Sequence, residues 1–189
     1  ARALHEQCLA VRRKLGDKRG VAASLNNLGP VVFSLGDHAQ AVTLFEESLA
    51  LEREVGDKRG IAISLNNLGS AVGDLGDYGR AQALFEESLA LNQELRDTQS
   101  IAMSLHNLGE VAQRQGDLVR AAALYEQSLA LKRELGDKWG AAISLNTLGA
   151  VMLELKDYER ALSLYGETLL LAYDVGDRLR VANCSSASA

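Results

Sequence analysis

Apolar residues recur along the chain three or four positions apart, which is the spacing of one helix face. Near the start, Leu4, Cys8, Val11 and Leu15 form such a row and predict a helix over 1–15. The same row of positions returns at intervals of 40 residues. Eight further helices are predicted, at about 18–35, 38–55, 58–75, 78–95, 98–115, 118–135, 138–155 and 158–175.

A six-residue stretch sets the period of this pattern. Residues 64–69 read Ser-Leu-Asn-Asn-Leu-Gly, and related hexapeptides occupy 24–29, 104–109 and 144–149, which are 40 residues apart. A strict period of this size indicates an array of structural repeats, in which each unit buries its apolar face against its neighbours. The sequence predicts four complete 40-residue repeats with a half-repeat at each end.

Gly-Asp doublets such as Gly36-Asp37 separate the predicted helices. A glycine beyond a helix end adopts the left-handed conformation without the steric penalty of a Cβ. The aspartate that follows can accept hydrogen bonds from the free N–H groups of the next helix. Arg96 and Lys156 stand where the glycine is expected, which predicts a modest cost or a different conformation at those two turns.

Glycine also recurs inside the first helix of each pair, as at Gly29, where it costs about 1 kcal/mol relative to alanine. We therefore expect a neighbouring helix to approach closely at this position. The second helix carries a row of small, aromatic and small residues, such as Ala41, Phe45 and Ser48, which predicts a packing face. Cys8 occupies the position of Ser48 and is expected to pack in the same row.

Pro30 lies inside the first complete predicted helix, 18–35. Proline lacks the N–H that would donate to the carbonyl of Asn26, and its ring clashes with that turn. The sequence therefore predicts a kink in this helix.

Composition and charge limit the classes of partner. The chain is 47% hydrophobic and 24% charged, with a net charge of −5, so we expect no binding to nucleic acid or to an anionic membrane. No apolar run has the length of a membrane helix, no signal peptide is visible, and two distant cysteines give no disulfide framework. We expect a cytoplasmic protein and, because the chain starts in mid-pattern without Met, part of a longer one. The array is predicted as one domain over 1–182, with a frayed tail over 183–189.

Motifs for catalysis are absent from the sequence. His5, His38 and His106 share no metal-ligand spacing, and there is no glycine-rich phosphate loop or Gly-x-Ser-x-Gly motif. Adjacent carboxylates such as Glu46 and Glu47 point about 100° apart on a helix, so they cannot face one another as an acid–base pair. We expect no enzymatic activity and no cofactor.

The order Leu-x-x-Leu-Gly, Gly-Asp and Ala-x-x-x-Phe/Tyr in a helical hairpin resembles the tetratricopeptide repeat. The resemblance covers roughly residues 1–180. The usual unit has about 34 residues, and this longer one is similar to Pins-type adaptors, kinesin light chains and the sensor arrays of bacterial regulators. The resemblance implies an all-α fold, a right-handed superhelical solenoid of antiparallel helix pairs whose concave wall is lined by the first helices. The chain departs from the family in lacking a proline at the end of each repeat.

The resemblance also implies a groove for an extended peptide. In similar repeats, the residue at the position of Asn27, Asn67 and Asn107 hydrogen-bonds the peptide backbone, and a carboxamide offers both a donor and an acceptor for this. Residues four apart share that helix face, so apolar residues are expected to form pockets and arginines to select charge. The predicted groove residues are Arg19, Asn27, Arg59, Ile63, Asn67, Asp74, Met103, Asn107, Arg114, Trp139, Ile143 and Thr147.

Some of these residues have an alternative role. Helix asparagines can also cap or bridge neighbouring helices, and duplication copies a residue whatever its use. Trp139 fits either an anchor in the groove or packing on a loop. His106, next to Asn107, is expected at the groove edge or at the helix interface.

The sequence therefore favours a non-enzymatic scaffold that binds a peptide segment of a partner protein in the concave groove. One rival is a ligand-sensing or autoregulatory module of a larger signalling ATPase or transcription regulator. Another is self-association through the terminal half-repeats, whose apolar faces lack a cap.

Overall fold

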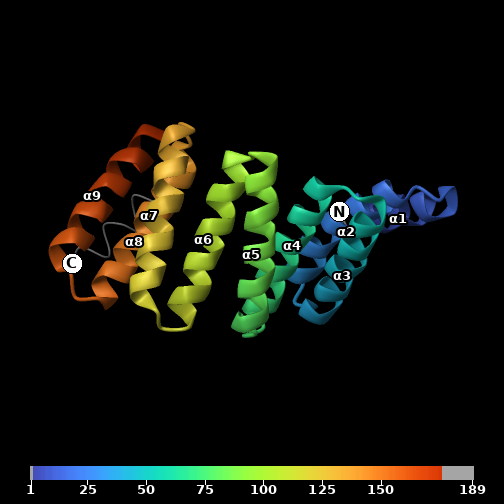
Figure 1. Cartoon of the computed structure of the whole chain (residues 1–189), viewed down its shortest axis with the longest axis horizontal. Helices are drawn as coiled ribbons and strands as arrows, with labels where there is room; N and C mark the ends of the chain where they lie inside the picture. The colour runs from blue at the N-terminus through green and yellow to red at the C-terminus, as the bar shows by residue number, and fades with distance from the viewer. Residues whose placement is uncertain (1, 176–189) are drawn as a thin grey trace. The chain divides into compact units, whose positions relative to one another are not determined.

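The computed structural model describes residues 2–175, which form nine α-helices with no strand among them (Figure 1). In chain order the helices are α1 (Arg2–Leu15), α2 (Lys18–Ser34), α3 (His38–Val55), α4 (Lys58–Asp74), α5 (Tyr78–Leu95), α6 (Thr98–Arg114), α7 (Leu118–Glu134), α8 (Lys138–Glu154) and α9 (Tyr158–Val175). From α2 onward, the helix bounds agree with the predicted ones to within one residue, so the all-α prediction is confirmed. The predicted tail over 183–189 lies outside the described residues.

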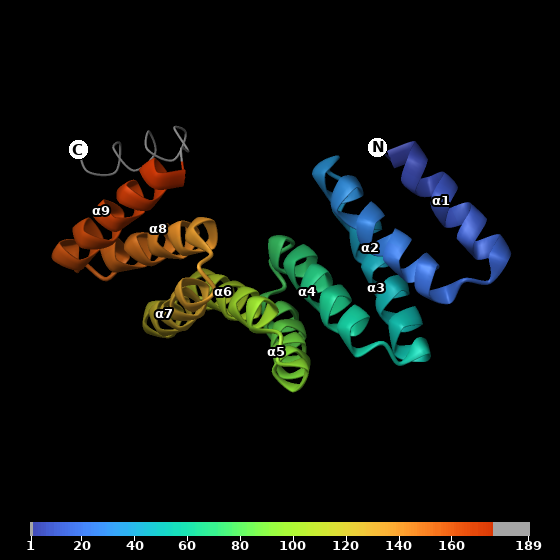
Figure 2. The same ribbon diagram turned by 90° about the horizontal axis from the view of Figure 1, so that it is seen from above.

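The helices belong to two compact units, divided in the sequence between Asp97 and Thr98. In the first unit each helix from α1 to α5 packs against the next, and in the second unit α6 to α9 do the same (Figures 1 and 2). Packing between sequence neighbours is the arrangement of a helical-repeat solenoid. No linker or change of composition in the sequence predicts this division. A single domain over 1–182 and a right-handed superhelix stay predictions.

The turns between helices follow the Gly-Asp pattern. Gly36 and Gly56 have φ of 88° and 74°, and the non-glycine residues Arg96 and Lys156 reach the same left-handed region at 54° and 63°. The conformation is thus kept without glycine, at the steric cost of a Cβ. The next helix is capped as predicted: the side chain of Asp37, for example, accepts a hydrogen bond from the N–H of Gln40.

Contacts between neighbouring helices explain the small and aromatic row. The ring of Phe45 fills the space beside Gly29, so the predicted close approach is confirmed. The buried hydroxyl of Ser48 donates to the carbonyl of Ala22 in the preceding helix, at 2.9 Å. Cys8 occupies the same position in α1 but is exposed. The prediction that it packs is wrong, because no described helix stands on that side of α1.

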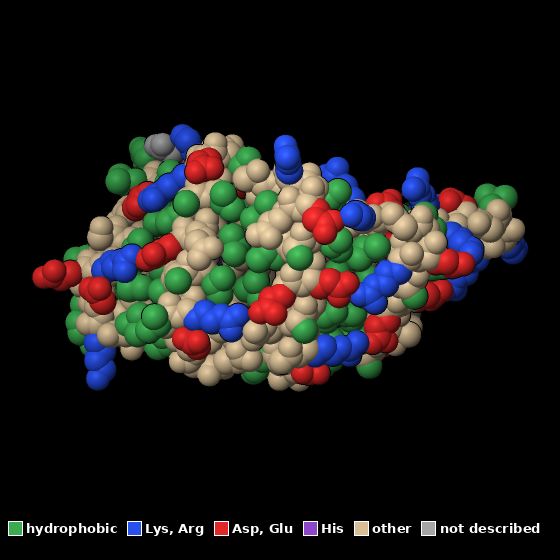
Figure 3. Space-filling view, in the orientation of Figure 1, with side chains coloured by type: hydrophobic (Ala, Val, Ile, Leu, Met, Phe, Trp, Pro, Cys, Tyr) green, Lys and Arg blue, Asp and Glu red, His purple; other side chains and the backbone are tan. Residues whose placement is uncertain are grey.

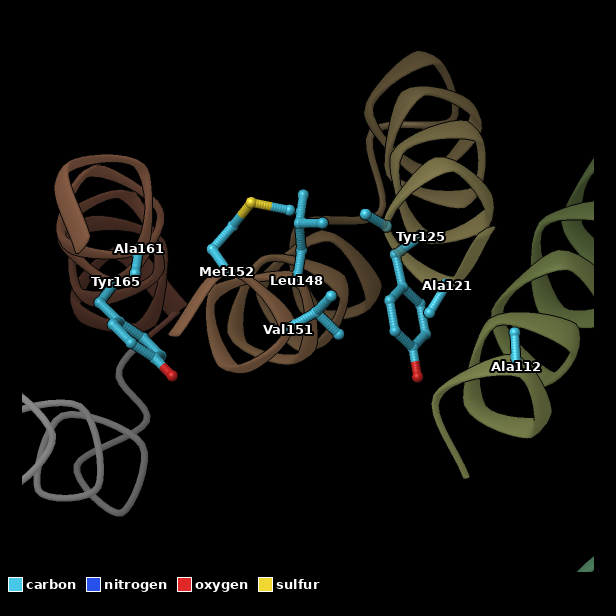
Figure 4. Packing of buried hydrophobic residues seen from close by; sticks show 9 residues of the cluster. Ala112, Ala121, Tyr125, Leu148, Val151, Met152, Ala161 and Tyr165 are labelled. Carbon is cyan, nitrogen blue, oxygen red and sulfur yellow. The ribbon is translucent and has the colours of Figure 1, made fainter. Parts of the chain in front are cut away.

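The core of the second unit repeats this arrangement (Figure 4). Leu148, Val151 and Met152 of α8 lie between Tyr125 of α7 and Tyr165 of α9, and all five side chains are buried. Each aromatic ring therefore joins two helices of one unit.

Helix α2 runs from Lys18 to Ser34 without a break, although Pro30 lies inside it. The helix is thus maintained across the missing N–H, and the predicted kink stays a prediction. None of the described helices combines the length and the apolarity that a bilayer-crossing helix requires.

Candidate functional site

In the first unit, the predicted asparagines lie on α2 and α4. Asn27 is exposed and Asn67 is half-buried. The side-chain Nδ2 of Asn67 lies 3.4 Å from Oδ1 of Asn26, and Asn26 in turn donates to Oγ of Ser64 at 2.8 Å. This chain of polar contacts joins the two helices, so Asn67 does bridge neighbouring helices. A carboxamide has two donors and an acceptor with two lone pairs, so the contact uses only part of its hydrogen-bonding capacity.

A pocket of about 210 Å³ opens beside Asn67. It brings together Asn67 and Asp74, two of the predicted groove residues, with Phe33 and Pro30 of α2. Neither Phe33 nor Pro30 was predicted to face a groove. The pocket combines an amide, a carboxylate and an aromatic ring, which are groups that can contact both the backbone and the side chains of a peptide.

The predicted arginines Arg19 and Arg59 stand near the start of α2 and α4. The Nε of Arg19 is 4.0 Å from Oδ2 of Asp57, and an Nη of Arg59 is 3.6 Å from Oδ2 of Asp97. Both arginine side chains are largely exposed, at 69% and 75%. Exposed pairs of this kind contribute little to stability, so both guanidinium groups remain accessible to a ligand. Ile63, on α4, is also exposed.

In the second unit, three predicted groove residues line one pocket. Met103 of α6 and Trp139 and Ile143 of α8 border a volume of about 410 Å³. Met103 and Trp139 are 43% and 49% exposed. Leu135 and Asp137 of the turn between α7 and α8 line the same pocket, so both roles considered for Trp139 stay predictions.

Two ionisable residues, Lys132 and His106, also line this pocket. Nζ of Lys132 donates to Oγ of Ser144 at 2.9 Å, and burial lowers the pKa of Lys132 against the opposing effect of Asp137. Nδ1 of His106 is buried and has no hydrogen-bond partner. Burial, and then the charge of Lys132, lowers the pKa of His106 to about 4. The imidazole is therefore neutral at physiological pH.

The remaining predicted residues lie elsewhere on the second unit. Asn107 is half-buried. An Nη of Arg114 lies 3.9 Å from Oε1 of Glu110 on the same helix. The hydroxyl of Thr147 bonds to the carbonyl of Ile143 in its own helix at 2.8 Å, so this hydroxyl is committed as a donor and can only accept from a ligand.

Lys132 was not among the predicted groove residues. The sequence does contain a signal for it, because the equivalent positions at intervals of 40 residues are polar in α1, α3 and α5, as Arg12, Glu52 and Asn92, although α9 has Ala172 there. Arg12 bonds to Ser24 and Lys132 bonds to Ser144, which are equivalent serines. The identity of the residue at this position therefore sets the charge beneath each first-helix face.

The adjacent carboxylates on the second helices form ion pairs with neighbouring repeats. Glu46 pairs with Arg80, and Glu47 pairs with Arg13. Acidic and basic side chains accordingly lie next to one another on the face shown in Figure 3. Among the residues that the structure describes, no group of three or more His, Cys, Asp or Glu could hold a metal ion.

Comparison with known proteins adds a family and a fold. The family model described as tetratricopeptide repeat matches residues 1–54, 31–94 and 100–173. A search of curated proteins found no match. Among solved structures, the chain is similar to a putative kinesin light chain with nearly identical TPR-like repeats from Podosopora anserina, with 20% identity and a TM-score of 0.74, over 93% of this chain and 86% of that one.

Two larger proteins share the fold over part of their length. One is a Rap protein complexed with Competence and Sporulation Factor, with 15% identity, a TM-score of 0.81 and coverage of 86% of this chain and 46% of that one. The other is a signal transduction ATPase with a tetratricopeptide repeat sensor from Pyrococcus horikoshii, with 14% identity, a TM-score of 0.79 and coverage of 88% and 26%.

Proposed function

Because the chain belongs to the tetratricopeptide repeat family, we propose that it is a non-enzymatic scaffold that binds a peptide segment of a partner protein. Within each unit, the proposed contact surface is formed by the first helices, which are α2 and α4 in the first unit and α6 and α8 in the second. The observation that carries this proposal is the second-unit pocket, where Met103 and Trp139 are half exposed on neighbouring first helices. Large apolar side chains that are exposed together beside a pocket indicate an interaction surface, whereas single exposed apolar residues are common on any protein.

The first unit contributes recognition of the peptide backbone. The amide of Asn67 borders a pocket and has hydrogen-bonding capacity beyond its long contact with Asn26. Backbone amides of a bound strand can both donate to and accept from such a group. The exposed guanidinium groups of Arg19 and Arg59 favour acidic side chains in a peptide that binds the first unit.

The experiment is selection of peptides from a random display library, followed by affinity measurement with single variants. Asn67→Ala and Trp139→Ala are each expected to weaken binding by about tenfold, the effect of one or two lost contacts. Gln127→Ala, an exposed residue of the second helix α7, is the control and should leave the affinity unchanged. If Gln127→Ala weakens binding while both groove variants do not, the partner occupies a different surface.

A second candidate is self-association. Leu4 and Leu15 of α1 are 67% and 75% exposed, and Leu162 and Leu170 of α9 are 63% and 71% exposed. These side chains offer apolar helix faces that another copy could cover. Light scattering over a concentration range tests this candidate, and a constant monomer mass would exclude it. A sensor role within a larger regulator stays a prediction.

A further inference from the structure

The two units fill an equivalent position in different ways. In the first unit, Asn26 donates to Ser64 and Arg19 lies near Asp57, so the polar side chains there contact one another. Ala23 is the small residue between them in the sequence.

In the second unit, the serine that corresponds to Ser64 is Ser144. It accepts a hydrogen bond from a residue of a second helix instead of a first helix. Lys132 donates to Ser144, while His106, at the position of Asn26, keeps a buried Nδ1 with no partner. Met103 stands where the first unit has Ala23, and Trp139 stands where it has an arginine. The outcome is a pocket with apolar walls, an ammonium group and an unsatisfied imidazole nitrogen.

One positively charged and one negatively charged side chain, those of Lys132 and Asp137, line this pocket. The ammonium of Lys132 has three N–H donors, and Ser144 takes one of them. The acidic residue that lines the pocket is Asp137, whose Oδ1 accepts from the N–H of Gly140 at 2.8 Å as the cap of α8. The positive end of a helix offsets the charge of a carboxylate in that place. His106 is neutral, and Asp137 also interacts electrostatically with Lys132. The ammonium of Lys132, with N–H donors beyond the one that Ser144 accepts, is therefore the group in this pocket that can attract a carboxylate.

We propose that this pocket binds a large apolar group that carries a carboxylate, with the carboxylate beside Lys132 and the apolar part against Met103 and Trp139. A volume of about 410 Å³ is within the usual range for a small-molecule site. The ligand can be a free carboxylic acid, or an acidic residue beside a large apolar one in a peptide. The proposal does not depend on the scaffold function, because a free acid is sufficient to test it.

Trp139 is the only tryptophan in the chain, so its fluorescence reports directly on this pocket. Three probes of similar shape distinguish the contribution of charge to the affinity from that of apolar contact. They are the anionic 3-phenylpropionate, the neutral 3-phenylpropanamide and the cationic 3-phenylpropylamine. We expect a saturable fluorescence change with the carboxylate, at an affinity about tenfold above that of the amide. A capped peptide with phenylalanine beside aspartate is tested in the same way. If 3-phenylpropionate binds more tightly, the ligand is a free carboxylic acid, and if the peptide does, the ligand is a peptide segment.

Variants test the role of Lys132. Lys132→Met keeps the aliphatic stem and is expected to reduce the affinity for 3-phenylpropionate to that for the amide, whereas Lys132→Arg should retain binding. Lys58→Met, which removes an exposed lysine paired with Glu94 in the first unit, should change nothing. Circular dichroism checks that each variant is folded.

The proposal fails if neither carboxylate gives a saturable change, if the native protein binds the amine most tightly, or if folded Lys132→Met binds 3-phenylpropionate as the native protein does. A negative result here would leave the peptide-selection experiment unaffected, since that experiment reports on any peptide and on Asn67 as well.

Discussion

A Cβ atom built on Gly29 would lie 2.3 Å from Cε1 of Phe45, well inside van der Waals contact. The equivalent distance is 2.8 Å between Gly109 and Tyr125. The aromatic ring of the second helix therefore occupies the space that a side chain on the first helix would need. This contact explains why glycine is kept in the interior of helices whose other residues favour helix formation.

We predict that Gly109→Ala destabilises the protein by about 1–3 kcal/mol, because the ring of Tyr125 must move out of a packed site. Gly166→Ala is the matched control. Gly166 also lies within a helix, but a Cβ there would meet no atom within 4 Å, so the same change should stabilise by about 0.5–1 kcal/mol. Urea denaturation of both variants measures the two effects. Equal effects in the same direction would contradict the packing explanation.

The left-handed turn residues give a second prediction. Lys156 has φ of 63°, and glycine adopts this conformation without the Cβ penalty. Lys156→Gly is therefore expected to raise the free energy of unfolding by about 0.5–1 kcal/mol, after allowance for the greater freedom of glycine in the unfolded chain. The reverse change, Gly116→Lys at φ of 82°, should lower it. Denaturation curves of the two variants measure these changes in the free energy of unfolding. Stabilisation by Gly116→Lys would contradict the prediction.

His106 predicts a loss of stability in acid. Its pKa falls from 6.5 to about 4 in the folded protein, so between these values the unfolded chain binds a proton that the folded chain does not. The free energy of unfolding should fall as the pH drops through this window, by up to about 3 kcal/mol. His106→Asn, which places the residue of Asn26 at this position, should show a flatter pH dependence. Denaturation near neutral pH and near pH 4 tests it, and identical slopes for the two proteins would refute it.

Glu52 predicts the opposite trend. Its side chain is only 6% exposed and Oε2 has no hydrogen-bond partner. Burial, and then Asp57, raises its pKa above the usual 4.5, so the contribution of this carboxyl to stability is present at low pH and is lost as the pH rises through the folded-state pKa. Glu52→Gln should therefore stabilise the protein at neutral pH, with the gain vanishing below pH 4.5.

Glu54→Gln is the control for the Glu52 prediction. Glu54 is exposed and pairs with Lys18, so its replacement should not stabilise the protein at neutral pH. A gain of equal size in both variants would point to net charge rather than burial as the cause.

The helices were predictable because each is bounded by residues with a defined backbone role. Asp37 caps one helix, and Gly56 ends it in the left-handed conformation. The sequence predicted that another helix lies close to Gly29. The structure was needed to show that the contact is made by the ring of Phe45. Met103 and Trp139, which line the second-unit pocket, were among the predicted groove residues, and their role in binding stays a prediction.

Other features depend on side-chain contacts that periodicity does not encode. Lys132 belongs to a second helix, and its long side chain reaches Ser144 on a first helix. Asn67 contacts Asn26, which lies 41 positions away in the sequence and not at the same position of its repeat. The division between Asp97 and Thr98 follows from packing, and no change of composition marks it.

The pairing of each helix with its sequence neighbours also bears on how the chain folds. Within each unit, contacts join segments that are close in the sequence, so little loop entropy is lost before a contact forms, and chains of such low contact order fold quickly. Any adjacent pair, such as α2 and α3, can serve as a nucleus from which folding spreads to the next helix. During synthesis, the earlier hairpins can therefore fold before the later ones leave the ribosome.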